Sequence, residues 1–142
     1  MLELLLVIFI LSIIASVLFF AFVRLGFHQT LEQEAATARA FLEEARIHTQ
    51  SSRLASSHGV LFSEDGITLF RGPSWDDREE ILKEHRFDSS VRVTSINFAD
   101  DSDEVVFTRL FGEPTTIGKI ELSSLRNDSQ RSIAVTASGF IE

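Results

Sequence analysis

The sequence has no cysteine and no tyrosine, only two prolines, and fewer basic than acidic residues. The absence of cysteine excludes disulfide bonds and thiol chemistry. Because 13 Lys and Arg face 21 Asp and Glu, the formal net charge is −8, which argues against a surface that binds nucleic acid by neutralising phosphates. The sequence contains no glycine-rich phosphate loop, nucleophile motif or metal-binding histidine pair. It therefore predicts neither a catalytic centre nor a cofactor.

What the chain does have is a long hydrophobic run at its N-terminus. Residues 4–23 contain no charge, glycine or proline, and only Ser12 and Ser16 are polar. About 20 residues at ~1.5 Å each match the ~30 Å hydrocarbon core of a bilayer. Because apolar side chains lie on every side, this helix belongs in lipid or inside a helical assembly. A secretory signal peptide is disfavoured, since the basic n-region and the small-residue cleavage site are absent.

One acidic residue, Glu3, lies at the edge of this run. An acid at the start of a membrane helix is a candidate functional residue by default. The alternative is that Glu3 is simply an anion at the helix N-terminus, where the helix dipole stabilises negative charge. The residues alone leave both interpretations open.

The segment MLELLLVIFILSIIAS resembles the N-terminal segment of type IV pilins and type II secretion pseudopilins. In that family a glutamate is followed by an apolar run, and residues 2–8 match the part that begins just before the glutamate. The resemblance implies that Glu3 meets the N-terminal amine of a neighbouring subunit and sets its register. It also implies a membrane-helix and filament-core role for Leu4, Leu5, Leu6, Val7, Ile8, Ile10 and Leu11.

In the family, a basic leader ending in glycine, then an aromatic residue and a threonine, precede the glutamate. Met1 and Leu2 do not match that pattern. We expect the true start to lie upstream, in which case prepilin peptidase is a partner. The other implied partners are pilin or pseudopilin subunits, an inner-membrane assembly platform and membrane lipid. The implied location is the bacterial inner membrane, crossed once, with the C-terminal domain outside the cytoplasm until the subunit joins a filament.

After the hydrophobic run the helical pattern continues in amphipathic form. Small or apolar residues recur at spacings of three and four, namely Leu31, Ala35, Ala38, Leu42 and Ala45. We expect one helix from residue 2 to about residue 55, ended by Gly59 as a left-handed cap. Residues 1–23 would form its transmembrane or filament-core half and residues 24–57 its amphipathic half. The four histidines are expected on the surface or on a helix face.

Residues 58–142 have the character of an antiparallel β domain. A hairpin is predicted from residues 60–62 and 67–70 with Asp-Gly at the turn, and further strands are predicted at 91–96, 105–107, 117–122 and 132–136. Residues 78–85 predict a weak helix. The fold class is α+β, with a long N-terminal helix packed on a small antiparallel meander. The order of strands and glycines after residue 104 resembles the C-terminal half of the GspH/FimT group of minor pseudopilins.

The acidic run Asp100, Asp101, Asp103 and Glu104 is a weak candidate metal site, because hard cations favour clustered carboxylates. It lacks the spacing and the turn glycine of a helix–loop–helix calcium site. We therefore favour a solvated acidic loop.

Together these features predict a structural, non-enzymatic subunit, a minor pseudopilin of a type II secretion system or type IV pilus-like filament. A bitopic membrane protein with an extracytoplasmic sensing or binding domain is one alternative. A DNA-uptake minor pilin is another, but it needs a basic tail or patch, and the C-terminal sequence SGFIE provides none.

Overall fold

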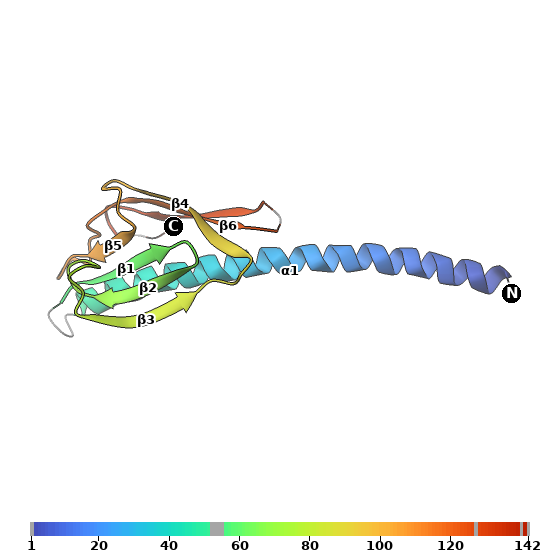
Figure 1. Ribbon diagram of the computed structural model, residues 1–142, viewed down its shortest axis with the longest axis horizontal. Coiled ribbons are helices and arrows are strands. Elements are labelled where there is room, and N and C mark those ends of the chain that lie inside the picture. Colours follow the sequence, from blue (N-terminus) through green and yellow to red (C-terminus); the bar gives the residue numbers. More distant parts are fainter. Residues whose placement is uncertain (1, 52–55, 127, 140, 142) are drawn as a thin grey trace.

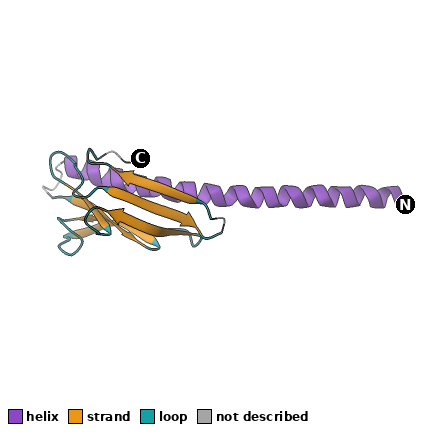
Figure 2. Cartoon of the chain, turned by 90° about the horizontal axis from the view of Figure 1, so that it is seen from above, coloured by secondary structure: helices purple, strands orange, loops and turns teal. Residues whose placement is uncertain are grey.

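The computed structural model describes residues 2–51, 56–126, 128–139 and 141, with the backbone alone for residues 22–28. One long helix, α1 (Leu2–Gln50), runs the length of the molecule, and seven strands cover only its C-terminal part (Figures 1 and 2). Its 49 residues correspond to a length of about 74 Å. No proline interrupts the chain before Pro73, which allows the helix to continue unbroken from the apolar run into the amphipathic stripe.

The C-terminal end of the helix differs from the sequence prediction. The helix ends at Gln50 rather than near residue 55, and residues 52–55 lie outside the described part of the chain. Gly59 is not a helix cap, because it belongs to the first strand. It is needed there for close packing, since a Cβ atom at this position would lie 2.5 Å from the ring of Phe70 and 2.9 Å from Val106.

The strands are β1 (His58–Ser63), β2 (Gly66–Arg71), β3 (Glu80–Arg86), β4 (Val91–Phe98), β5 (Glu104–Phe107), β6 (Gly118–Ser124) and β7 (Gln130–Val135). They form two antiparallel sheets. The first sheet has the order β3-β2-β1-β5 and the second the order β4-β6-β7. The predicted single meander is therefore wrong. After β4 the chain returns to the first sheet, where β5 pairs with β1. It then goes back to the second sheet, where β6 pairs with β4, so the chain alternates between the two sheets.

Two local predictions have different outcomes. The first hairpin is confirmed, with Ser63 opposite Gly66, but Gly66 belongs to β2 and the two turn residues are Glu64 and Asp65. The weak helix at residues 78–85 is wrong, because residues 80–86 form β3. Charged residues dominate this segment and give no clear alternation in sequence. The free edge of β2 decides its conformation by supplying backbone partners along nearly the whole segment, with one register shift between Leu69 and Phe70.

The helix and both sheets share one hydrophobic core. All five residues of the predicted helical stripe are at most 3% exposed, and Phe41 joins them at 2%. Phe62 of β1 and Phe98 of β4 bring the two sheets together, with ring centroids 6.3 Å apart. Among the side chains that the structure describes, Leu31 is the first buried one of the helix, so the domain holds the helix from about this residue to its end.

Candidate functional site

The N-terminal half of α1 projects from the domain (Figure 1), and its described apolar side chains are exposed. Fifteen large hydrophobic residues between Leu2 and Phe20 are exposed, and Phe9 and Phe20 are 64% and 71% accessible. Covering this surface would be favourable by on the order of 20 kcal/mol. By length and composition, Leu2–Ala21 is able to cross a membrane. A segment of this kind requires lipid or other helices around it.

The structure gathers every predicted assembly residue on this bare segment. Glu3 lies in the first turn of α1, and residues 4–11 follow it on an uninterrupted helix. Two hydroxyl groups interrupt the apolar surface. Ser12 donates a 2.8 Å hydrogen bond to the carbonyl of Phe9, and Ser16 donates one of 2.8 Å to the carbonyl of Ser12. Because both hydroxyls are satisfied within the helix, neither opposes an apolar environment.

Where the helix enters the domain, a partly buried carboxylate joins it to the first sheet. The side chain of Glu34 is 12% exposed, and its Oε2 lies 2.7 Å from Nε2 of His85 on β3. Its Oε1 accepts a 3.1 Å hydrogen bond from the backbone N–H of Asp88. Two residues earlier, Glu32 pairs with Arg131 of the second sheet. These contacts tie the exit point of the helix to both sheets.

The far end of the helix is held by side chains that reach the last residues of the chain and the loop after β5. Arg46 donates hydrogen bonds of 2.9 Å and 3.2 Å to the carbonyls of Gly139 and Ser138. Gln50 donates a 3.1 Å hydrogen bond to the carbonyl of Phe111. The sequence did not indicate these contacts, because each joins residues at least 61 positions apart.

A buried histidine completes this end of the helix. His58 is 2% exposed, and its backbone N–H donates a 3.0 Å hydrogen bond to the hydroxyl of Thr49. Burial, together with the nearby charges of His48 and Arg71, lowers the pKa of His58 below its ordinary value. The prediction that all four histidines lie on the surface or a helix face is therefore wrong for His58. The apolar residues that follow His58 in β1 were the feature of the sequence that could have indicated its burial.

The three aspartates of the acidic run lie in the loop between β4 and β5, Glu104 is the first residue of β5, and two of the four carboxylates have partners. Oδ1 of Asp100 accepts hydrogen bonds from the hydroxyls of Ser102, at 2.7 Å, and Thr116, at 2.9 Å. Glu104 accepts a 2.6 Å hydrogen bond from the backbone N–H of Trp75. In the described part of the chain, no group of three or more His, Asp or Glu side chains is arranged to hold a metal ion.

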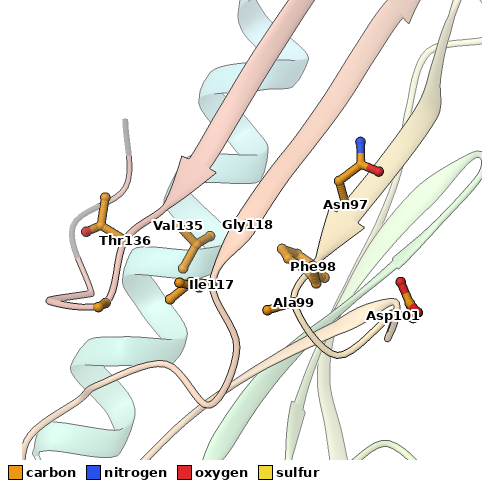
Figure 3. A pocket seen from close by; sticks show the side chains of 9 residues that line it. Asn97, Phe98, Ala99, Asp101, Ile117, Gly118, Val135 and Thr136 are labelled. Atoms are coloured by element: carbon orange, nitrogen blue, oxygen red, sulfur yellow. The ribbon is translucent and has the colours of Figure 1, made fainter.

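An open hollow of about 640 Å³ lies at the end of the second sheet, where β4 and β7 end and β6 begins (Figure 3). Apolar side chains provide most of its surface, including Phe98 and Ile117, and Asp101 lies at its rim. Figure 3 shows Ile117 beside Val135, with Asp101 on the opposite side of Phe98. This hollow is at the end of the domain that lies away from the bare helix.

These features define a pilin-like fold: one long helix, apolar and exposed at its N-terminal half, packed on a small antiparallel β domain. No protein-family model and no curated protein matches the sequence. Among solved structures, the chain is similar to the minor pseudopilin EpsH from the type II secretion system of Vibrio cholerae. The similarity has a TM-score of 0.60 at 10% identity and covers 79% of this chain and 94% of EpsH. It confirms the predicted α+β pilin-like fold.

Proposed function

We propose that this chain is a minor pseudopilin, a structural subunit that assembles through its N-terminal helix into the filament of a type II secretion system or type IV pilus-like machine. The observation that carries the proposal is the bare apolar half of α1, which continues without a break into the buried half. The fold shared with EpsH supports it. The proposed place of the subunit before assembly is the bacterial inner membrane, crossed once by Leu2–Ala21.

The same helix would serve two states in turn. In the membrane, lipid covers its apolar side chains, and in the filament the helices of neighbouring subunits cover them. Moving from lipid to a helical assembly gains no hydrophobic free energy, since both surroundings are apolar. Packing and polar pairing must therefore favour assembly. Glu3 is the residue we assign to this pairing, with the N-terminal amine of a neighbouring subunit as its partner.

In a filament held together by its helices, each helix would move its domain. The contacts between the helix and the domain, here called the joint, must therefore be rigid. Glu34 and Arg46 hold the two ends of the buried half, and the apolar stripe fills the space between them. The subunit would then move as one body when the filament grows. Its further partners would be the assembly platform in the inner membrane and, if the chain starts upstream, prepilin peptidase.

The test compares Glu3→Ala with Glu43→Ala in cells that assemble the filament. Glu43 is an exposed acid on the domain-covered part of the same helix, so it controls for loss of a carboxylate. We expect Glu3→Ala to insert and fold normally but to enter the filament fraction several-fold less than Glu43→Ala. Equal incorporation of the two variants would remove Glu3 from the mechanism.

A cysteine introduced at Leu11 tests the helix contact itself, because the natural chain has no cysteine to compete. A photo-cross-linker attached to Leu11→Cys should link the subunit covalently to its neighbours in assembled material. A variant that inserts in the membrane and never cross-links would contradict assembly through the helix.

A further inference from the structure

The turn between β6 and β7 lies at the end of the domain nearest the bare half of α1 (Figure 1). Hydrogen bonds fix its backbone. The N–H of Leu125 donates a 2.8 Å hydrogen bond to the carbonyl of Ser90 in the loop after β3, and the N–H of Ser124 donates one of 2.9 Å to the carbonyl of Ser129. Leu125 is nevertheless 56% exposed. The turn therefore holds a large aliphatic side chain in a fixed, exposed position.

Single exposed leucines are common on protein surfaces, so the informative feature of Leu125 is its distance from the membrane segment. α1 is one unbroken helix from Leu2 to Gln50, and the domain holds it from about Leu31. Leu31 follows Ala21, the last residue of the segment able to cross a membrane, by ten residues, or about 15 Å. Because a helix and not a flexible loop joins the two, the domain stays at this height above the membrane.

The turn extends back across much of this distance, since the strands run roughly along α1 (Figures 1 and 2). Glu32 of the helix pairs with Arg131 of β7, which lies opposite Leu122 of β6. Leu125 is three residues nearer the turn, which at about 3.3 Å each adds roughly 10 Å toward the membrane. Those 10 Å correspond to about seven helical residues, so Leu125 lies level with about residue 25. It is then roughly 6 Å from the end of the apolar segment, which corresponds to a head-group layer about 5–8 Å thick.

The charged side chains of the neighbouring loops at this end are paired with one another. Arg86 lies 2.7 Å from Asp65, and Arg92 pairs with Glu64. Each pair cancels much of its own field, so attraction to anionic lipid is not the force expected to hold this end of the domain. An aliphatic side chain gains free energy by leaving water for the lipid interface whatever charge the lipid carries. An apolar contact therefore fits this end of the domain.

We propose that, before assembly, the β6–β7 turn rests on the extracytoplasmic surface of the bilayer that α1 crosses, with Leu125 in the lipid head-group layer. This inference rests on the proposed function, which places Leu2–Ala21 in the membrane. Membrane helices are tilted by about 20° on average, and a tilt toward the second sheet would bring the turn deeper into that layer. The subunit would then be held at two points, which fixes the tilt and rotation of its helix. Joining a filament would require the turn to leave the lipid surface.

Fluorescence quenching tests the contact in the full chain, reconstituted in vesicles of phosphatidylethanolamine and phosphatidylglycerol. A small fluorophore is attached to Arg126→Cys, which leaves Leu125 in place, and the chain has no natural cysteine to compete. The control site is Leu110→Cys, 71% exposed in the loop after β5. That loop lies at the other end of the domain, where Gln50 ends α1 and bonds to the carbonyl of Phe111.

A spin label on the lipid head groups should quench the fluorophore at Arg126→Cys several-fold more than the fluorophore at Leu110→Cys. The physical reason is that the first site lies at the head-group layer and the second lies on the far side of the domain. Equal quenching at the two sites would overturn the contact.

A second substitution tests Leu125 itself. Leu125→Ser in the Arg126→Cys chain should lower the quenching at least twofold, because the apolar group that holds the turn is lost. Leu110→Ser, which removes another exposed leucine, should leave it unchanged. High salt should also leave it unchanged, since salt screens charges and not apolar contacts. Quenching that survives Leu125→Ser, or that disappears at high salt, would show that Leu125 does not hold the turn at the membrane.

A fluorophore at Phe9→Cys separates this inference from the proposed function. Phe9 lies within the apolar segment and is 64% exposed. If quenchers on the lipid acyl chains act on Phe9→Cys while Arg126→Cys is quenched no more than Leu110→Cys, the helix is in the membrane and the inference alone is refuted. If Phe9→Cys is not quenched either, the membrane stage of the proposed function fails as well.

Discussion

Glu34 provides the most direct measure of how firmly the helix is joined to the domain. Its carboxylate makes two contacts, one with His85 at 2.7 Å and one with the N–H of Asp88 at 3.1 Å. The substitution Glu34→Ala removes both at once. Because it lies on α1 at the point where the helix leaves the domain, the change affects the joint without touching the bare segment.

The magnitude follows from these contacts. Hydrogen bonds to charged groups contribute about 1.5–3 kcal/mol when buried. The His85 side chain is 35% exposed, and Asp88 is exposed, so solvent screens the first contact and water can replace the second. We therefore take about 1–1.5 kcal/mol for each contact, at or below the lower limit of the range, and expect a loss of roughly 2–3 kcal/mol. With a urea m-value of about 1.5 kcal/mol per molar, the midpoint should fall by roughly 1–2 M.

The assay is urea unfolding of the full chain in mild detergent, followed by tryptophan fluorescence. Trp75 is the single tryptophan, and it packs against Phe70 with ring centroids 5.6 Å apart, so its emission reports on the domain. Glu43→Ala is the matched control and should change stability by no more than about 0.5 kcal/mol. If Glu34→Ala is as mild as Glu43→Ala, the contacts of Glu34 do not stabilise the joint and the reasoning is wrong.

Two predictions concern pH. Burial lowers the pKa of His58 in the folded chain below its ordinary value of 6.5. Between these two pKa values the unfolded chain binds a proton that the folded chain does not. The free energy of unfolding should therefore fall as the pH drops through this window. The urea midpoint should show this decrease, and His58→Gln should make the midpoint depend less steeply on pH. An unchanged pH dependence in His58→Gln would contradict this role of His58. Burial raises the pKa of Glu104, so the folded chain retains a proton longer and stability falls as the pH rises above the ordinary value of 4.5. Glu104→Gln keeps an acceptor for the N–H of Trp75 and should be more stable than the natural chain at pH 7 but not at pH 4; equal stability at pH 7 would refute it.

Parts of the fold were predictable because local physics decides them. The spacing of Leu31, Ala35 and Leu42 indicated which face of the helix would be buried, and the structure buries that face. A short apolar segment on each side of Glu64 and Asp65 indicated a hairpin, since neighbouring strands need only a tight turn to pair. In both cases the residues that interact are close in sequence.

Other parts depended on partners far along the chain. Residues 80–86 become β3 because β2 presents an open edge, although their own pattern favoured a weak helix. The division into two sheets follows from β5 returning to β1 rather than pairing with its neighbour β4. His58 is buried because Thr49 accepts its N–H at the end of the helix. None of these pairings leaves a periodic signal in the sequence.

By itself, the sequence determined that residues 4–23 form an apolar helix that needs lipid or other helices around it, because composition and length alone decide how such a segment partitions. It also determined that the helix continues into an amphipathic half. Only the tertiary structure decided how the domain holds that half, through Glu34 and Arg46, and which surfaces lie at its two ends. The reason is physical. Hydrophobic partition and helical periodicity are properties of a local stretch, whereas an ion pair, a sheet order or a hollow exists only after distant segments have been brought together.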